Sequence, residues 1–524
     1  MTIAALARLA YAGIVLAREG AAPAGLAEQL PPIPRFLARA ARSLERRDLP
    51  STERASRLTT ALNRLGPSYV KLGQFLATRP DLVGRELATA LGGLRDEMAP
   101  FPMEAARETI ARELGAPVES LYSAFSDPVA AASIAQVHRA TVREGEATRT
   151  VAVKVLRPGI ALRFRRDLAT FYAGARLAGR FDPSLRRLRL IEVVDTLARS
   201  VAIEMDLRLE AAALAEMAEK VEGGEGFRVP AVDWARSSRE VLTLEWIDGT
   251  KLSDLSALKA AGHDLPKIAA RLIQAFLRQA LRDGFFHADL HQGNLFVEAD
   301  GGIVAVDFGI MGRIGPRERR FLAEVLYGFI KRDYRRIAEV HFEAGYVPPR
   351  HSVEDFAQAL RAIGEPIHGQ SAASISMAKL LMLLFEVTEL FDMATRPELL
   401  LLQKTMVVVE GVARSLDPDF DMWAAAEPVV AQWIERHLGP AGRLEEAARN
   451  AGSLAALVGT LPVLAERAER LAKSFADMSE SGLRLDERTV NALAREEARA
   501  GRATRIALWV IAAVLLVALL RGRL

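Results

Sequence analysis

Over most of the chain apolar residues return with a helical period, and strand-like alternation is confined to a few short segments. Residues 1–19 are mostly apolar and predict a helix, but Arg8 interrupts the run, so we do not expect a secretory signal. The prolines within Pro31–Pro34 then mark a linker. A helical pattern continues from there to Leu114, and it resumes from Leu265.

The alternating segments predict strands. Val151–Val155 surrounds one charged residue, Lys154, with apolar neighbours, as in a strand that aims a cation into a cleft. A lysine on an edge strand that points to water gives the same pattern. Val241–Gly249 predicts a second strand, which ends in a polar turn. Together with the helices these strands predict an α+β fold.

The candidate chemistry lies in two motifs beyond these strands. HADLHQGN contains Asp289 and Asn294, and VDFG contains Asp307. An Asp, four residues, an Asn and then Asp-Phe-Gly is the phosphoryl-transfer pattern of protein-kinase-like folds. We expect Asn294 and Asp307 to bind Mg²⁺ through oxygen atoms, Asp289 to act where the nucleophile loses its proton, and Lys154 to hold the phosphates. The sequence therefore predicts an enzyme that binds ATP and Mg²⁺.

The segment before Lys154 departs from ordinary kinases, because no glycine-rich loop is present. Alanines occupy its place within Pro128–Ala140, and alanine does not adopt positive φ as glycine does. We expect this change to alter nucleotide selectivity and to slow ordinary phosphotransfer. The candidate nucleotide contacts in this segment are Ala130, Ala131, Ala132 and Ser133.

Val241–Gly249 predicts a strand that enters a hinge, and kinase-like folds bind adenine through backbone groups at this hinge. Glu245 and Ile247 are the candidates here, and a buried strand end is an equal alternative for either residue. His287 and His291 have the spacing of a metal pair, but no cysteine or third histidine is nearby. We therefore expect His287 to be the histidine of the catalytic loop.

The segment after Asp307 differs from that of a protein kinase. It passes almost at once into a helical pattern, without an A-P-E motif or a long activation segment. That segment forms the peptide platform in protein kinases. Ala288 stands where the H-R-D arginine would be. Both features argue against a general protein kinase that is regulated by phosphorylation of this segment.

The chain resembles the UbiB (aarF/ADCK) family of atypical kinase-like proteins in three stretches, AAASIAQVH, EMDLRLEA and KLGQFLATRPDL. The resemblance covers about Leu65 to Pro418. It implies a bilobal kinase-like fold with a helical extension, carrying the KxGQ motif, that packs over the active site. Gln292 and Ala135 depart from the commoner proline and glycine of the family. The residues that match the family's KxGQ and ExD motifs and its helix glutamate are Lys71, Gly73, Gln74, Glu204, Asp206 and Glu210.

The family implies that Glu210 pairs with Lys154 and that the KxGQ and ExD residues gate the pocket. Asp206 and Glu210 are four residues apart, so the spacing predicts that they share one face of a helix. Taken without the family, the same spacing fits a solvated acidic face. We predict five regions: an N-terminal helical extension (1–116), a small lobe (117–247), a large lobe (248–430), C-terminal helices (431–502) and a transmembrane anchor (503–523).

Composition narrows the class of protein. The 524 residues include no cysteine, which excludes disulfides, thiolate metal sites and cysteine nucleophiles. The net charge of +3 is too small to predict nucleic-acid binding. Half of the residues are apolar and only 6% are aromatic, in keeping with a strongly helical protein.

The C-terminal tail carries the second functional signal. Ile506–Leu520 is an uninterrupted apolar run with arginines on both sides. As a helix it would be about 23 Å long, shorter than the roughly 30 Å hydrocarbon core, so flanking arginines would have to snorkel. A buried or interfacial helix is the alternative. Leu454–Leu464 is too short and too interrupted by Gly and Pro to predict a second span. We expect a bacterial inner-membrane anchor with the catalytic body facing the cytoplasm.

Membership in the family implies a role in ubiquinone biosynthesis. The leading hypothesis is an ATPase that helps to present or extract polyprenyl-phenol precursors. The alternatives are a true kinase for a protein or small molecule and an ATP-binding pseudokinase scaffold. The implied partners are lipid-like phenol or quinone precursors, the membrane and the biosynthetic enzymes, and a second copy of the chain is a further candidate.

Overall fold

The fold is that of a computed structural model of the 524-residue chain. Contacts divide the chain into two units, Met1–Ile434 and Glu435–Leu524. The first unit contains all the motifs above, and in the second only residues 435–439 are described. The structure describes residues 3–21, 54–77, 85–92, 98–181, 188–221, 226–365, 390–393 and 397–439, with single residues at 79, 83, 94 and 387.

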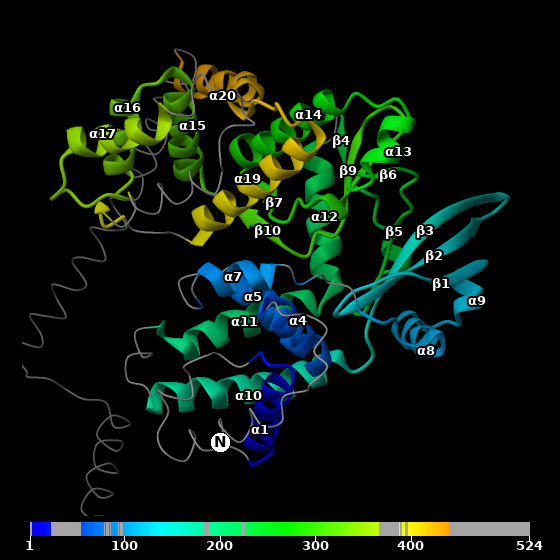
Figure 1. The fold of residues 1–524 in the computed structure, drawn as a ribbon. Coiled ribbons are helices and arrows are strands. Elements are labelled where there is room, and N and C mark those ends of the chain that lie inside the picture. The colour runs from blue at the N-terminus through cyan, green and yellow to red at the C-terminus, as the bar shows by residue number, and fades with distance from the viewer. Residues whose placement is uncertain are drawn as a thin grey trace, which may run out of the picture. The chain divides into compact units, whose positions relative to one another are not determined.

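A four-stranded antiparallel sheet carries the candidate lysine (Figure 1). Its strand order is β1-β2-β3-β5. Lys154 lies on the inner strand β3, opposite Val137 of β2 and Leu242 of β5. The edge-strand alternative is therefore wrong. The four strands are β1 (Ala124–Ala131), β2 (Ala135–Glu144), β3 (Ala147–Leu156) and β5 (Val241–Glu245).

Alternation along β3 separates the core from the site. Val151, Val153 and Val155 are fully buried on one face of the sheet, in a cluster with Ile110 of α8 (Met103–Leu114). Because successive side chains of a strand point to opposite faces, Lys154 lies on the other face. There it meets α12 (Leu207–Val221).

A second, mixed sheet and a two-stranded ribbon carry the catalytic motifs. The sheet has the order β4-β9-β8-β6, and β8 and β9 form an antiparallel hairpin. The ribbon pairs β7 with β10. The strands are β4 (Phe227–Arg228), β6 (Thr250–Lys251), β8 (Leu295–Val297), β9 (Ile303–Ala305), β7 (Phe285–His287) and β10 (Met311–Arg313).

The central helix beside these strands is α14 (Leu265–Arg278). Asp264 caps it by accepting a hydrogen bond from the backbone N–H of Lys267, and proline occupies its first turn. Its buried face packs against α19 (Pro397–Leu416). A five-residue π-helical segment, Gln279–Asp283, then leads into β7. Such segments occur frequently at functional sites.

Further helices precede and follow these sheets (Figure 1). The KxGQ motif lies in α5, which packs against α4 and α7. The remaining bounds are α1 (Ile3–Arg18), α4 (Arg54–Leu65), α5 (Pro67–Ala77), α7 (Arg85–Gly92), α9 (Val118–Leu121), α10 (Ile160–Phe181), α11 (Leu190–Glu204), α13 (Leu255–Ala260), α15 (Pro316–Lys331), α16 (Tyr334–Glu343), α17 (Val353–Gly364) and α20 (Met422–Leu438), with short 3-10 turns at Trp234–Arg236 and Gln292–Asn294.

The mixed architecture confirms the α+β class. Of Pro128–Ala140, expected as a loop, most is strand: Ala130 and Ala131 end β1, and the turn contains only residues 132–134. Among the described helices, none combines the length and apolar content needed to cross a bilayer. The linker at Pro31–Pro34, the segment Leu454–Leu464 and the tail Ile506–Leu520 lie outside the described residues, as do the predicted anchor 503–523 and most of the predicted region 431–502.

Candidate active site

Lys154 is held between two carboxylates. Its Nζ lies 2.9 Å from each carboxylate oxygen of Glu210 and 2.9 Å from Oδ1 of Asp307. The Glu210 side chain is only 7% exposed, while that of Asp307 is 53% exposed. The lysine thus joins α12, the antiparallel sheet and the Asp-Phe-Gly segment.

The three groups shift one another's pKa values. Burial works against the charge of Lys154, but Asp307 and Glu210 outweigh it and hold the lysine pKa above its ordinary value. Burial raises the pKa of Glu210, against the opposing effect of Lys154. Lys154, more than any other group, lowers the pKa of Asp307 to about 2. Asp307 is therefore an ionised, partly exposed carboxylate at neutral pH.

The β8–β9 hairpin brings Asn294 and Asp307 together. Asn294 immediately precedes β8, and its carbonyl accepts a hydrogen bond from the N–H of Val306 at 2.9 Å. Asp307 is the next residue and has a φ of 63°, in the left-handed region that non-glycine residues seldom adopt. Phe308 is buried and packs edge-on against His287, which anchors the backbone on the other side of Asp307.

The catalytic loop is ordered by its own hydrogen bonds. The N–H of Asp289 donates to Nδ1 of His287 at 3.0 Å, and the other ring nitrogen, Nε2, lies 3.2 Å from the carbonyl of Val306. Because an N–H only donates and a carbonyl only accepts, His287 must carry its proton on Nε2. Burial lowers its pKa and favours this neutral form. Both nitrogens are thus occupied by backbone groups, which fits the role of a loop histidine and not that of a metal ligand.

Two further side chains of this loop face Asp289. Asn294 Nδ2 donates to the Asp289 carbonyl at 3.1 Å, so its Oδ1 is left to accept or to coordinate. His291 Nδ1 accepts from the N–H of Gly293 at 3.0 Å, and its Nε2 lies 3.8 Å from Oδ2 of Asp289. The loop therefore holds the Asn294 side chain against the backbone of Asp289 and the His291 ring beside the Asp289 carboxylate.

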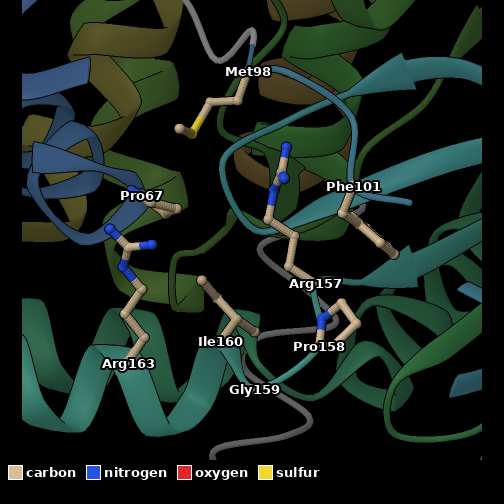
Figure 2. A pocket seen from close by; sticks show the side chains of 8 residues that line it. All are labelled: Pro67, Met98, Phe101, Arg157, Pro158, Gly159, Ile160 and Arg163. Carbon is tan, nitrogen blue, oxygen red and sulfur yellow. The ribbon is translucent and has the colours of Figure 1, made fainter. Parts of the chain in front are cut away.

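The alanine-containing turn is fixed by Arg157. The guanidinium donates to the carbonyl of Ala132 through Nε (2.9 Å) and Nη2 (2.8 Å), and Nη2 also donates to the carbonyl of Ala99 (2.9 Å). Ser133 lies in the same turn and is fully buried. A cavity of about 250 Å³ adjoins Arg157 (Figure 2). It is lined by Pro67, Met98, Phe101, Arg157, Pro158, Gly159, Ile160 and Arg163.

The KxGQ and ExD motifs meet through one ion pair. Lys71 Nζ of α5 lies 2.5 Å from a carboxylate oxygen of Glu204, at the end of α11. Lys71 also contributes to the lowered pKa of Asp307, so its charge is close to the active site. Gly73 lies against the side chains of Leu62 and Leu94, and Gln74 is half-buried on the same helix.

Asp206 does not share a helical face with Glu210. It precedes the first residue of α12, and its carboxylate accepts hydrogen bonds from Arg208, whose guanidinium lies at 2.6 Å. The expectation of a common face is therefore wrong. The reason is that the helix begins only at Leu207, so Glu210 alone turns inward to Lys154.

The hinge residues lie at the end of β5 and just after it. The Glu245 carboxylate accepts two hydrogen bonds of 3.0 Å from Arg228, and its backbone N–H donates to Ala231 at 2.9 Å. Arg228 also pairs with Glu298 at 2.6 Å, so one guanidinium links the end of β5 with the end of β8. The carboxylate and the backbone N–H of Glu245 therefore both form hydrogen bonds within the protein. Ile247 follows in the segment between β5 and β6.

Several residues that support the site belong to none of the motifs in the sequence. Arg157 holds the alanine turn, and Thr405 and Ser415 of α19 contact the catalytic loop. No local motif marks Thr405 or Ser415. Gln292 lies in the HADLHQGN motif, and its side chain donates a hydrogen bond to Ser415. This residue is therefore the signal in the sequence for a contact of the loop with another element.

The donor set fits Mg²⁺ and a nucleotide triphosphate. Asn294 and Asp307 offer the oxygen ligands that Mg²⁺ prefers, and Lys154 offers a cation beside them. Among the described residues, the site included, no group of three or more His, Asp or Glu side chains is arranged to hold a metal ion, so the candidate ligands are one carboxylate and one amide. The alanine turn lies on the same sheet as Lys154.

Comparison with known proteins agrees with this arrangement. A family model of the ABC1 atypical kinase-like domain matches residues 93–341, and one of the UbiB helical domain matches residues 360–421. The protein named "Probable protein kinase UbiB" of Marinobacter nauticus is 41% identical over 401 residues, which are 76% of this chain and 73% of its own. Its namesake in Azotobacter vinelandii is 40% identical over 397 residues, 75% of this chain and 73% of its own.

A solved structure is also similar. The complex of Rv3197 with erythromycin from Mycobacterium tuberculosis has 26% identity and a TM-score of 0.50, and the match covers 72% of this chain and 95% of that chain. With these similarities and the geometry of the site, the chain belongs to the UbiB family of ABC1 atypical kinase-like proteins.

Proposed function

We propose that this protein hydrolyses MgATP and uses the reaction to present or extract polyprenylated phenol precursors of ubiquinone at the bacterial inner membrane. The observation that carries the proposal is Lys154, held between Glu210 and Asp307, beside Asn294 and the loop of Asp289. The site thus combines the three kinds of group that phosphoryl transfer needs: a cation for the phosphates, oxygen ligands for a metal ion, and a carboxylate for the nucleophile.

The roles of the residues follow from their environments. Lys154, positioned by Glu210, would bind the phosphates, while Asn294 Oδ1 and Asp307 would hold Mg²⁺, which neutralises charge on the phosphates when it is bound. Asp289 would orient a water molecule or hydroxyl and accept its proton. Its backbone is fixed by His287 and Asn294, so the carboxylate is presented from a rigid loop.

Water is a better acceptor than a protein hydroxyl at this site. After Asp307 the chain passes through β10 and begins α15 at Pro316, which leaves no room in sequence for a peptide-binding platform. The Lys71–Glu204 pair brings the KxGQ helix close to Asp307. Both features favour hydrolysis over transfer to a protein.

The link with quinones and membranes rests on the family and on the sequence. Two relatives carry the name UbiB, and the apolar run Ile506–Leu520 has the composition of a short anchor. The catalytic body would then work on the cytoplasmic side, next to enzymes that modify the phenol ring. A membrane-embedded precursor fits a protein whose active site has no peptide platform.

The test is ATP turnover by the full-length protein with liposomes and a phenol mimic. Asp289→Asn removes the carboxylate that acts on the nucleophile, and Asp307→Asn removes a metal ligand. We expect both variants to lose turnover by a factor of about 100 or more. Only Asp307→Asn should also weaken binding of MgATP.

Three outcomes separate the hypotheses. Phosphate release without labelling of protein supports the ATPase. Transfer of labelled phosphate to a protein or a small molecule would replace it by a kinase. Binding of MgATP with no turnover above that of Asp289→Asn would make the protein an ATP-binding scaffold.

A further inference from the structure

One helix, α19, contacts the catalytic loop on both sides of Asp289. The hydroxyl of Thr405 donates to the carbonyl of Ala288, the residue before Asp289, at 3.1 Å. The side-chain amide of Gln292, three residues after Asp289, donates to the hydroxyl of Ser415 at 3.2 Å. The carboxylate therefore lies between two tethers that come from a distant part of the chain.

The first tether is fully buried. Thr405 has no exposed surface and Ala288 is only 1% exposed. The Thr405 hydroxyl also lies 2.8 Å from the carbonyl of Leu401, one turn earlier in α19, so its single proton is shared between two acceptors. A buried carbonyl that loses its donor is costly. The contact thus favours one position of the Ala288 backbone.

The second tether joins two polar side chains, Gln292 of the catalytic loop and Ser415 of α19. The Ser415 hydroxyl donates to the carbonyl of Val412 at 2.6 Å and accepts from Gln292. A residue without a side-chain donor at position 292 could not make this bond.

The next helix supports the start of the same segment. Trp433 Nε1 of α20 donates to the carbonyl of Leu281 in the π-helical turn, at 2.9 Å. Within that turn the side-chain oxygen of Gln279 accepts from the N–H of His287 at 3.1 Å. Helices α19 and α20 thus brace the chain both before and after Asp289.

We propose that Thr405 and Ser415 are positioning residues, through which α19 sets the rate of the reaction at Asp289. Both lie within the UbiB helical domain match at 360–421, outside the kinase-like match at 93–341. The helical domain would then hold the catalytic loop in its active position through fixed contacts. In a regulated kinase a long activation segment controls whether the site is ordered. The effect on turnover rests on the proposed function, whereas the effect on loop order does not.

The decisive variant is Thr405→Val in the full-length protein, because valine keeps the shape and removes the hydroxyl. We expect kcat for MgATP hydrolysis to fall by about 10-fold while KM stays within about twofold. Thr405→Ser keeps the donor and should restore kcat. Thr109→Val is the matched control, since Thr109 is 1% exposed and bonds one turn back to Ala105 at 2.9 Å, but on α8 behind the sheet.

Hydrogen exchange gives a readout that needs no catalysis. The N–H groups of His291 and Asn294 are bonded within the loop, and Thr405→Val should speed their exchange by about 10-fold, with no change in Thr109→Val. Equal exchange in wild type and Thr405→Val would overturn the proposal. So would an unchanged kcat in an active enzyme, or a Thr405→Ser variant as impaired as Thr405→Val.

Failure of the proposed function would look different. If the wild type releases no phosphate, the ATPase fails, and the exchange rates alone then decide whether α19 clamps the loop. The second tether is tested by Gln292→Ala and Ser415→Ala. Each single change and the double change should have the same effect on exchange, because each removes the same bond, and additive effects would overturn that tether.

Discussion

Lys154 shows at the scale of single residues how burial and charge compete. Its two carboxylate partners respond in opposite ways, since burial raises the pKa of Glu210 while the lysine lowers that of Asp307. The partly exposed Asp307 is thus kept charged, while the buried Glu210 bonds to the lysine and to the backbone of Phe308. The family resemblance implied the pairing of Lys154 with Glu210, whereas the spacing argument from Asp206 was wrong. The contact of Lys154 with Asp307 depends on folding, because the two residues are far apart in sequence.

The packing around Gly73 of the KxGQ motif leaves no space for a larger side chain. A Cβ atom there would lie 2.5 Å from Leu94 and 2.8 Å from Leu62, closer than side chains pack. We predict that Gly73→Ala lowers the free energy of unfolding by about 1–3 kcal/mol, because Leu62 of α4 and Leu94, two residues beyond α7, must move away. Urea denaturation of the wild type and the variant measures this.

A glycine in open space provides the control for this prediction. Gly179 lies in α10, and a Cβ atom added there would have no other atom within 4 Å. Gly179→Ala should therefore be neutral or stabilising by up to about 1 kcal/mol. Truncation of Leu94 in the Gly73→Ala background should recover part of the loss. If Gly73→Ala is as stable as the wild type, close packing is not the reason for glycine at this position.

At the scale of elements, α12 is fixed at two points. Near its start Glu210 meets Lys154, and further along Glu216 forms a two-pronged ion pair with Arg313 of β10, with one contact at 2.9 Å. The Arg313 guanidinium also lies 4.2 Å from the ring centre of Phe285. Because Arg313 follows Asp307 by six residues, this ion pair ties the helix with Glu210 to the Asp-Phe-Gly segment.

We predict that Arg313→Ala raises KM for ATP about two- to fivefold and leaves kcat within about twofold, since α12 would hold Glu210 less firmly. The Arg313 side chain is 65% exposed, so the cost in stability should stay below about 1 kcal/mol. Steady-state kinetics of Arg313→Ala, Glu216→Gln and the double variant form the test. Strictly additive effects on KM would show that the pair does not act through α12.

At the scale of the whole molecule, three histidines link stability to pH: His138 and His287 are buried and His341 is half-buried. Burial lowers the pKa of His138 in β2, His287 in the catalytic loop and His341 in α16. Each is neutral in the folded protein but binds a proton in the unfolded chain below its ordinary pKa of 6.5. The unfolded state therefore gains protons as the pH falls, and folding loses stability below about pH 6.5.

His341 offers the cleanest test because it is remote from the active site. We predict that the free energy of unfolding falls between about pH 7 and about pH 5, each histidine adding at most about 1.4 kcal/mol per pH unit. His341→Gln should reduce that slope by its share, as measured by urea denaturation across this range. An unchanged slope would mean that His341 is protonated equally in both states.

Much of the site could be predicted from sequence because its information is local. The alternation at Val151–Val155 already placed Lys154 on the face opposite the core, and the spacing from Asp289 to Asn294 and on to Asp307 placed three polar groups at adjacent turns. Such spacings determine which side of a strand or loop a residue occupies, independently of the rest of the fold.

Tertiary structure decided the contacts between distant segments. It paired Lys71 with Glu204, fixed the alanine turn through Arg157, and placed Thr405 against Ala288. No local sequence pattern predicts these contacts. Each joins residues that are distant in sequence, so each depends on how the helices and sheets pack. Sequence by itself determined which chemical groups the protein offers and on which face of its element each lies. Only packing decided which groups meet, since their distances are set by the burial of apolar faces elsewhere in the chain.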